Sequence, residues 1–212
     1  MHDHAHGERH GAKQPQRFDP ARAARLDDPA RFEYLPPADV LTLLDAPHGA
    51  TVVDFGTGTG TYALEIARLR PDLHVIALDE QPQMLDLLRA KLQTESLSNV
   101  EPVGTEALPR LRRTATRILA INVLHEVGDA ALAGLHELLA ADGSITVIDW
   151  NAEIPENPDR LLGRPVGPPR DHVYTPSEAR ARLEKNGFEV VRDAAFPYHY
   201  VLIVRSAISV QS

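Results

Sequence analysis

A short stretch at residues 52–64, VVDFGTGTGTYAL, joins an apolar run to three glycines at alternate positions and then to a helical pattern. An apolar, β-branched run that ends in glycines is typical of a buried strand followed by a tight loop. Tyr62, Ile66 and Ala67 share one helical face, which indicates a helix directly after the loop. The stretch therefore predicts a strand–loop–helix unit, the repeating element of α/β folds.

The same alternation of strand and helix patterns continues to residue 150. Because the strand patterns are apolar on both faces, we expect a mostly parallel sheet covered by helices on each side. The expected strands are residues 51–55, 73–79, 99–103, 117–124 and 144–150, and the expected helices between them are 61–70, 84–92 and 131–143, the last ending at Gly143.

The end of the chain has a different pattern. Thr175 opens a capping-box motif, which predicts a helix that ends at Asn186-Gly187. Residues 188–206 are then expected to form two strands joined by a turn near Asp193. With no helix between them, these two strands should pair antiparallel.

The bulk composition limits the classes of function. The 212 residues carry a net charge of −8, which argues against a nucleic-acid or anionic-membrane binder, since both need a basic face. No apolar run approaches the roughly 18 residues that span a bilayer, and the N-terminus has no apolar core of the signal-peptide kind. We therefore expect no membrane span and a cytoplasmic protein. The chain has no cysteine, which excludes disulfides, thiolate metal sites and thiol nucleophiles.

We expect a single domain with short tails. Residues 1–16 are rich in histidine and predicted to be a disordered tail; we favour a solvated tail over a weak transition-metal site, so no metal is expected. Residues 17–206 should form the domain, with proline-punctuated short helices at 17–46 as a cap, and residues 207–212 a C-terminal tail. The proline- and glycine-rich segment 151–174 is predicted to be a long loop of the kind that often forms a lid.

The spacing of the glycines bears on the ligand. In an open α/β sheet the loop after the first strand lies at the ligand-binding edge, so Gly56, Gly58 and Gly60 should line a cleft. The dinucleotide fingerprint G-x-G-x-x-G would need a third glycine at position 61, where this chain has Thr61. The pattern observed here begins at Asp54 and is D-x-G-x-G-x-G.

This pattern resembles that of the class I S-adenosylmethionine-dependent methyltransferases, most of all the type 11 branch that includes the ubiquinone- and menaquinone-biosynthesis methyltransferases. The likeness runs from about residue 35 to residue 205. It rests on VDFGTGTG, on LDEQPQML after the second strand, on GTEALP after the third and on INVLHEV at the fourth. The resemblance implies S-adenosyl-L-methionine as cofactor. It also implies a Rossmann-like α/β fold with a seven-stranded, mostly parallel sheet in the order 3-2-1-4-5-7-6, its last strand antiparallel and helices on both faces.

The resemblance further implies which residues hold the cofactor. S-adenosylmethionine offers a ribose diol and no phosphate, and a carboxylate at Asp79 can accept both ribose hydroxyls. Asp54 would orient the glycine loop and the ammonium group, and Asn122 would lie under the methionine part. The other implied contacts are Gly56, Gly58 and Gly60 in the loop, Glu80 beside Asp79, Met84 against the adenine, and Thr105 and Glu106 as candidates for the adenine amino group.

The implied reaction is an in-line displacement in which a substrate nucleophile takes the methyl group. The enzyme would contribute alignment and the exclusion of water, with a general base only where the nucleophile is protonated near pH 7. His125 and Glu126, after the fourth strand, are the candidate bases. Asp149 and Trp150, at the end of the fifth strand, are expected to form the floor of the substrate pocket.

The substrate is expected to be a small molecule, such as a quinone-like ring, because the acidic charge disfavours nucleic acids. We expect a monomer or a homodimer. Two other functions stay open from the sequence. One is a non-catalytic S-adenosylmethionine-binding module; the other is an NAD-dependent oxidoreductase, which would bind NADH instead.

Overall fold

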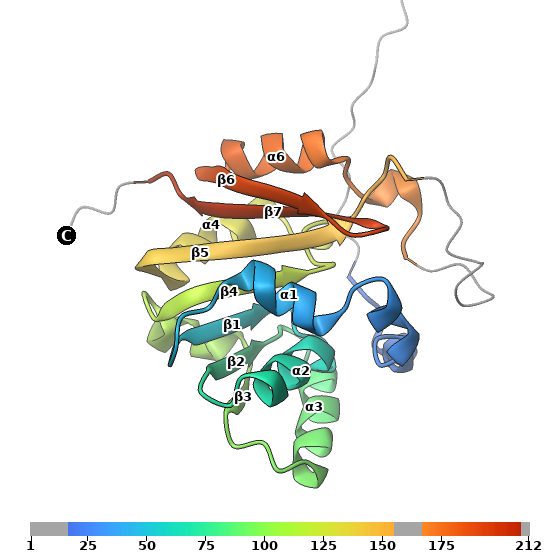
Figure 1. The fold of residues 1–212 in the computed structure, drawn as a ribbon, viewed down its shortest axis with the longest axis vertical. Helices are drawn as coiled ribbons and strands as arrows, with labels where there is room; N and C mark the ends of the chain where they lie inside the picture. Colours follow the sequence, from blue (N-terminus) through green and yellow to red (C-terminus); the bar gives the residue numbers. More distant parts are fainter. Residues whose placement is uncertain (1–16, 155–166, 209–212) are drawn as a thin grey trace, which may run out of the picture.

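The computed structural model describes residues 17–154 and 167–208, which build one seven-stranded sheet between helices (Figure 1). The strands are β1 (Thr51–Phe55), β2 (His74–Leu78), β3 (Val100–Val103), β4 (Ala115–Ile121), β5 (Leu139–Trp150), β6 (Phe188–Ala195) and β7 (His199–Ser206). Their order is β3-β2-β1-β4-β5-β7-β6, and β7 runs antiparallel to both its neighbours while the other pairs are parallel. The expected fold class and strand order are confirmed.

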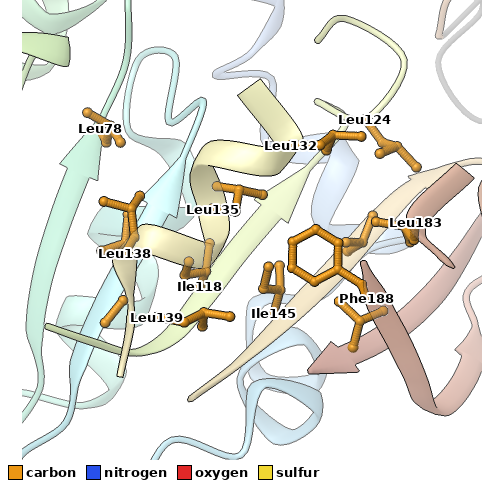
Figure 2. Packing of buried hydrophobic residues seen from close by; sticks show 14 of the residues in the cluster. Leu78, Ile118, Leu124, Leu132, Leu135, Leu138, Leu139, Ile145, Leu183 and Phe188 are labelled. Carbon is orange, nitrogen blue, oxygen red and sulfur yellow. The ribbon is translucent and has the colours of Figure 1, made fainter. Parts of the chain in front are cut away.

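Helices cover both faces of the sheet. They are α1 (Pro37–Leu44), α2 (Thr61–Leu69), α3 (Pro82–Thr94), α4 (Asp129–Leu138) and α6 (Pro176–Lys185), with short 3₁₀ turns η1 (Pro20–Arg25), η2 (Pro29–Glu33), η3 (Thr105–Leu111) and η4 (Arg170–His172). One buried cluster joins α1 and α2 to the sheet, and a second joins α4 and α6 to its other face. In Figure 2, Leu135 and Leu138 of α4 lie beside Ile118 of β4. Each leucine buried in this way contributes about 1.5–3 kcal/mol of hydrophobic stabilisation.

The end of α4 differs from the prediction. The helix ends at Leu138 rather than at Gly143, and β5 begins at the next residue because Leu139 pairs with Ala115 of β4. A register shift follows in this ladder, and a Cβ at position 143 would lie 2.9 Å from the carbonyl oxygen of Ala115. Gly143 therefore permits a close approach of two strands and does not cap a helix.

The turn between the last two strands also differs from the prediction. Asp193 lies within β6 and pairs with Leu202, while the turn lies at residues 196–198. The N–H of Phe196 donates to the carbonyl oxygen of His199 at 2.9 Å and closes it. Pro197 has no N–H to give to a ladder, so the chain reverses around it.

Several predicted segments lie wholly or partly outside the described residues. These are the histidine-rich tail at residues 1–16, the middle of the segment 151–174, and residues 209–212. The expected short helices at the start of the domain are present as η1 and η2, each capped by an aspartate side chain, Asp19 and Asp28. Among the helices of the described ranges, none has the length and apolar character to cross a bilayer.

Candidate functional site

A cavity of about 970 Å³ opens at the carboxyl ends of β1, β2 and β4. The residues that end these strands or follow them, including Asp54, Asp79 and Asn122, line its wall. The N-terminal segment, residues 17–34, lines it from the opposite side, at the end of the sheet to which the parallel arrows point (Figure 1). This is the edge where open α/β sheets bind ligands, as the sequence predicted.

The glycine loop forms part of the cavity wall with its bare backbone. Gly56 and Gly60 have positive φ angles of 71° and 79°, a region that other residues avoid. A Cβ at Gly56 would overlap the side chain of Val123, and one at Gly60 would overlap that of Leu88. Glycine is therefore required at both positions for the loop to fold against β4 and α3. Gly56 and Gly58 line the cavity as predicted, but Gly60 does not, because it packs against Leu88 of α3.

Asp79 is held at the end of β2 with both carboxylate oxygens oriented. Its Oδ2 accepts the N–H of Gly58 at 2.7 Å, and its Oδ1 accepts the N–H of Gln81 at 2.9 Å. Burial raises the pKa of Asp79 above its ordinary value, and these two hydrogen bonds partly oppose that rise. A carboxylate has about four acceptor positions. Two are used by the backbone, so each oxygen keeps one for a ligand diol.

Asp54 lies beneath the glycine loop and is almost fully buried. Its Oδ2 accepts the hydroxyl of Thr57 at 2.6 Å, which ties the carboxylate to the loop. Burial raises the pKa of Asp54 to about 6, and the nearby charge of Asp79 adds to the rise. This contact supports the expected role of Asp54 in orienting the loop.

Asn122 carries backbone strain and an unsatisfied polar atom in the cavity wall. The expected strand 117–124 ends earlier, at Ile121, because Asn122 turns into the left-handed region with φ of 56°. Its buried side-chain oxygen, Oδ1, has no hydrogen-bond partner among the described residues. Strained residues and unpaired buried acceptors concentrate at ligand sites. Asn122 therefore suits a ligand that brings an N–H donor, such as the ammonium group of an amino acid.

Of the other predicted cofactor residues, three line the cavity and one does not. Met84 is buried and lines the cavity, and Thr105 lines it as well. Glu80 lines the cavity but forms an ion pair with Arg17 at 2.5 Å. Glu106 accepts the N–H of Gly104 at 3.1 Å and is not among the residues that line the cavity.

His125 and Glu126 lie together at the cavity, and the structure adds Asp149 to them. Nδ1 of His125 lies 2.8 Å from Oδ1 of Asp149, and Nε2 lies 3.6 Å from Oε1 of Glu126. The backbone N–H of His125 also donates to Asp149 at 3.1 Å. The imidazole therefore stands between two carboxylates, with its Nδ1 position taken by Asp149 and its Nε2 edge toward Glu126.

The charges around His125 set its protonation. Burial alone would lower the pKa of His125, but the Asp149 carboxylate and, less strongly, Glu126 outweigh burial and raise it. Burial raises the pKa of Glu126 to about 7, against the opposing effect of His125. Glu126 thus exchanges its proton near neutral pH, as catalytic acids and bases do, and His125 holds its proton more strongly than a free imidazole does. Asp149 was expected only as a pocket floor. The signal for its pairing is that it lies near the end of β5 while His125 follows the end of the neighbouring strand β4.

The N-terminal segment connects to this cluster and to the cofactor side of the cavity. The N–H of Phe18 donates to Oε2 of Glu126 at 3.0 Å, and its carbonyl accepts the amide of Gln81 at 3.2 Å. Farther along, Asp27 accepts hydrogen bonds from Thr59 and Lys91. These contacts fix the N-terminal segment as one wall of the cavity, and no local sequence pattern predicts them.

An aromatic cluster borders the same cavity. Trp150 lines it. The centroid of the His199 ring lies 4.1 Å from that of the Trp150 ring and 5.8 Å from that of the Tyr34 ring. His199 is fully buried, and burial lowers its pKa to about 3, so the ring is neutral. His172 also lines the cavity, from η4. No group of three or more metal-ligating side chains occurs within the described ranges.

Comparison with known proteins agrees with this geometry. Residues 52–143 match a family described as a methyltransferase domain. A crystal structure of a SAM-dependent methyltransferase from Aquifex aeolicus is 28% identical, with a TM-score of 0.78 over 89% of this chain and 98% of that chain. An uncharacterised methyltransferase of Mycobacterium tuberculosis is 31% identical over 152 residues, 66% of this chain and 58% of the relative.

The curated relatives are diverse in what they are named for. The release factor glutamine methyltransferase of Escherichia coli is 28% identical over 105 residues, 46% of this chain and 38% of the relative. This chain thus spans well under half the length of the first curated relatives it matches. The ubiquinone- and menaquinone-like branch stays a prediction. Residues 52–143 thus match a methyltransferase domain, and the strand order and the structural neighbours identify the fold as that of the class I S-adenosylmethionine-dependent methyltransferases, whose cofactor is S-adenosyl-L-methionine.

Proposed function

We propose that this chain transfers the methyl group of S-adenosylmethionine to a small molecule bound in the same cavity. One observation carries the proposal: the glycine loop and Asp79 line a single cavity together with His125 and Glu126. Its volume of about 970 Å³ is at the upper end of the roughly 300–1,000 Å³ typical of small-molecule sites. A cofactor and a small substrate can therefore lie side by side within reach of one acid–base cluster.

The residues of the cavity wall fit the cofactor. The free acceptor positions of Asp79 suit the ribose hydroxyls, and the unpaired Oδ1 of Asn122 suits the ammonium group. Met84 and Thr105 would border the adenine. Gly56 and Gly58 line the cavity and would present their backbone to the ligand. When bound, S-adenosylmethionine supplies a methyl group on a positively charged sulfur.

His125 is the base that we assign to substrates with a protonated nucleophile. Asp149 holds Nδ1 of the imidazole, so the lone pair at Nε2 of the neutral ring is available to accept the proton of a substrate hydroxyl or amine. Asp149 then stabilises the imidazolium that forms. Glu126 anchors the N-terminal segment through Phe18, and this segment, which lines the cavity, would limit the entry of water once the ligands are bound. The chain thus supplies a proton acceptor, alignment and a closed site.

Two features favour a small molecule over a macromolecule as substrate. The chain carries a net charge of −8, which opposes the approach of nucleic acids. The N-terminal segment covers the cavity, so a nucleophile on a large surface has less access than a free metabolite. The name of the Escherichia coli relative, release factor glutamine methyltransferase, describes that relative, and we do not extend its substrate to this chain.

A methyl-transfer assay tests the proposal. We expect S-adenosylhomocysteine to form when the protein is incubated with S-adenosylmethionine and a small-metabolite fraction of a cell extract, and His125→Gln to reduce this turnover while still binding the cofactor. Binding without turnover on any metabolite fraction would instead indicate a non-catalytic module. Turnover only with the macromolecular fraction would refute the small-molecule class.

Cofactor binding is tested separately. Asp79→Ala removes the diol acceptor, and a charged hydrogen bond is worth about 1.5–3 kcal/mol, so the Kd for S-adenosylmethionine should rise by about 10- to 150-fold in calorimetry. Asp86→Ala on α3, whose exposed carboxylate pairs with Arg89, is the matched control and should leave the Kd unchanged. An unchanged Kd for Asp79→Ala would reject its role.

A further inference from the structure

Arg31, on η2, brings a guanidinium group into the cavity wall beside the glycine loop. Its Nη1 donates to the carbonyl oxygen of Leu26 at 2.6 Å, and its Cζ lies 5.3 Å from the centre of the Tyr62 ring. These two contacts hold the side chain in one place. The guanidinium is thus positioned as part of the site and is not a solvent-facing surface charge.

In the described part of the chain, this guanidinium has no acidic partner. Its Nε is buried and has no hydrogen-bond partner among the described residues, and within those ranges no carboxylate lies within 4.0 Å of it. Arg17, Arg70 and Arg182, by contrast, each pair with an acid. A guanidinium stays charged at every physiological pH, and a buried donor without an acceptor is unfavourable. The arrangement therefore suits an anionic ligand at this position in the cavity.

The position of Arg31 identifies the end of the ligand that it faces. The carbonyl oxygen of Leu26 that holds Arg31 also accepts the hydroxyl of Thr61, the first residue of α2, at 3.0 Å. Leu26 in turn lies against Gly58 of the glycine loop. The guanidinium is thus near the start of α2, where the helix dipole also favours negative charge.

Opposite charges flank this end of the cavity. Asp54 and Arg31 both line it, and the charge of Arg31 acts on Asp54, where it lowers the carboxyl pKa against the larger effect of burial. Asn122 adds its unpaired acceptor. An α-amino acid group carries one ammonium and one carboxylate, so an acid, an amide oxygen and a guanidinium around one end match such a group.

We propose that Arg31 binds the α-carboxylate of S-adenosylmethionine through charge-assisted hydrogen bonds, while Asp54 and Asn122 serve the ammonium group. This inference rests on the proposed function, because it assumes that cofactor in the cavity. It adds a binding residue that lies outside the matched domain, residues 52–143. The N-terminal segment is then part of the cofactor site and completes it.

A pair of ligands that differ only in the carboxylate tests the proposal. S-adenosylmethionine and decarboxylated S-adenosylmethionine are titrated in a calorimeter into the full-length protein and into Arg31→Met. We expect Arg31→Met to raise the Kd for S-adenosylmethionine by about 10- to 100-fold and the Kd for decarboxylated S-adenosylmethionine by less than about 2-fold. Comparing two ligands on two proteins in this way is a double-mutant cycle, which separates the contact between Arg31 and the carboxylate from other effects of the substitution.

Two further variants control the experiment. Arg192→Met removes an exposed arginine of β6 that does not line the cavity, and should leave both affinities at the wild-type values. Arg31→Lys keeps a charge without the planar fork, and should recover part of the affinity for S-adenosylmethionine only. If Arg31→Met does not fold, the ratio of the two affinities in Arg31→Lys decides the question.

The outcomes separate this inference from the function on which it rests. An equal loss for both ligands in Arg31→Met would show that Arg31 only supports the loop, and would overturn the inference while cofactor use stands. If the wild-type protein binds neither ligand, the proposed function fails and the inference fails with it. A selective loss for the carboxylate-bearing ligand supports both.

Discussion

The buried carboxyl of Asp54 is expected to reduce the stability of the ligand-free protein. Its pKa rises from 3.8 to about 6 because the charged form is buried under the glycine loop. Keeping that charge in the folded state above pH 6 costs about 3 kcal/mol relative to the unfolded chain. Asp54→Asn removes the charge and keeps one acceptor for the Thr57 hydroxyl. The loss of the second acceptor costs about 1 kcal/mol of the stability that is gained by removing the charge. We therefore expect the free energy of unfolding of Asp54→Asn to exceed that of the wild type by about 2 kcal/mol at pH 8.

The dependence on pH identifies the cause. A carboxyl whose pKa is raised by folding takes up its proton in the folded state first, so its unfavourable contribution is fully present above pH 6 and disappears below pH 3.8. About half of the 3 kcal/mol cost remains at pH 5. The advantage of Asp54→Asn over the wild type should therefore shrink to about 0.5 kcal/mol at pH 5.

Chemical and thermal unfolding at the two pH values measure this difference. For a chain of this size, about 2 kcal/mol corresponds to a rise in Tm of roughly 4–8 °C. Asp142→Asn, which changes an exposed aspartate, is the control and should follow the wild type at both pH values. The reasoning is refuted if Asp54→Asn is no more stable than the wild type at pH 8, or if its advantage does not depend on pH. The same variant should bind S-adenosylmethionine more weakly, because Asp54 orients the loop.

Three other changes test the site and the fold. Asp149→Asn removes the charge that raises the pKa of His125, so the rising limb of the pH–rate profile should move to lower pH and the maximal rate should fall. If the rising limb does not move, His125 is not the titrating base. Gly60→Ala places a Cβ on Leu88 at a φ of 79° and should lower the unfolding free energy by at least about 1–3 kcal/mol in denaturant titrations, whereas a stable variant would contradict the required close approach. Thr175→Ala removes the capping box of α6 and should cost about 1 kcal/mol in the same titrations with turnover unchanged; a change in turnover would link α6 to catalysis.

The sequence by itself determined the parts of the protein that depend on local patterns. Apolar strands that alternate with amphipathic helices specified the layered α/β fold, because each element must bury its own apolar face. The glycines at 56, 58 and 60 marked the loop, since glycine adopts the positive φ angles found there more readily than any other residue type. The predicted role of Asp79, which follows a strand end next to the loop, came from the resemblance to the methyltransferases and not from a local pattern.

Only the tertiary structure decided which distant side chains meet. Asp149 joins His125 because β4 and β5 are neighbours, and Arg31 reaches the cavity because the N-terminal segment folds back over the sheet edge. The ends of α4 and β6 were likewise set by pairing with other strands and not by the pattern of their own residues. Contacts between segments far apart in the chain leave no period in the sequence, so they become visible only when the chain is folded.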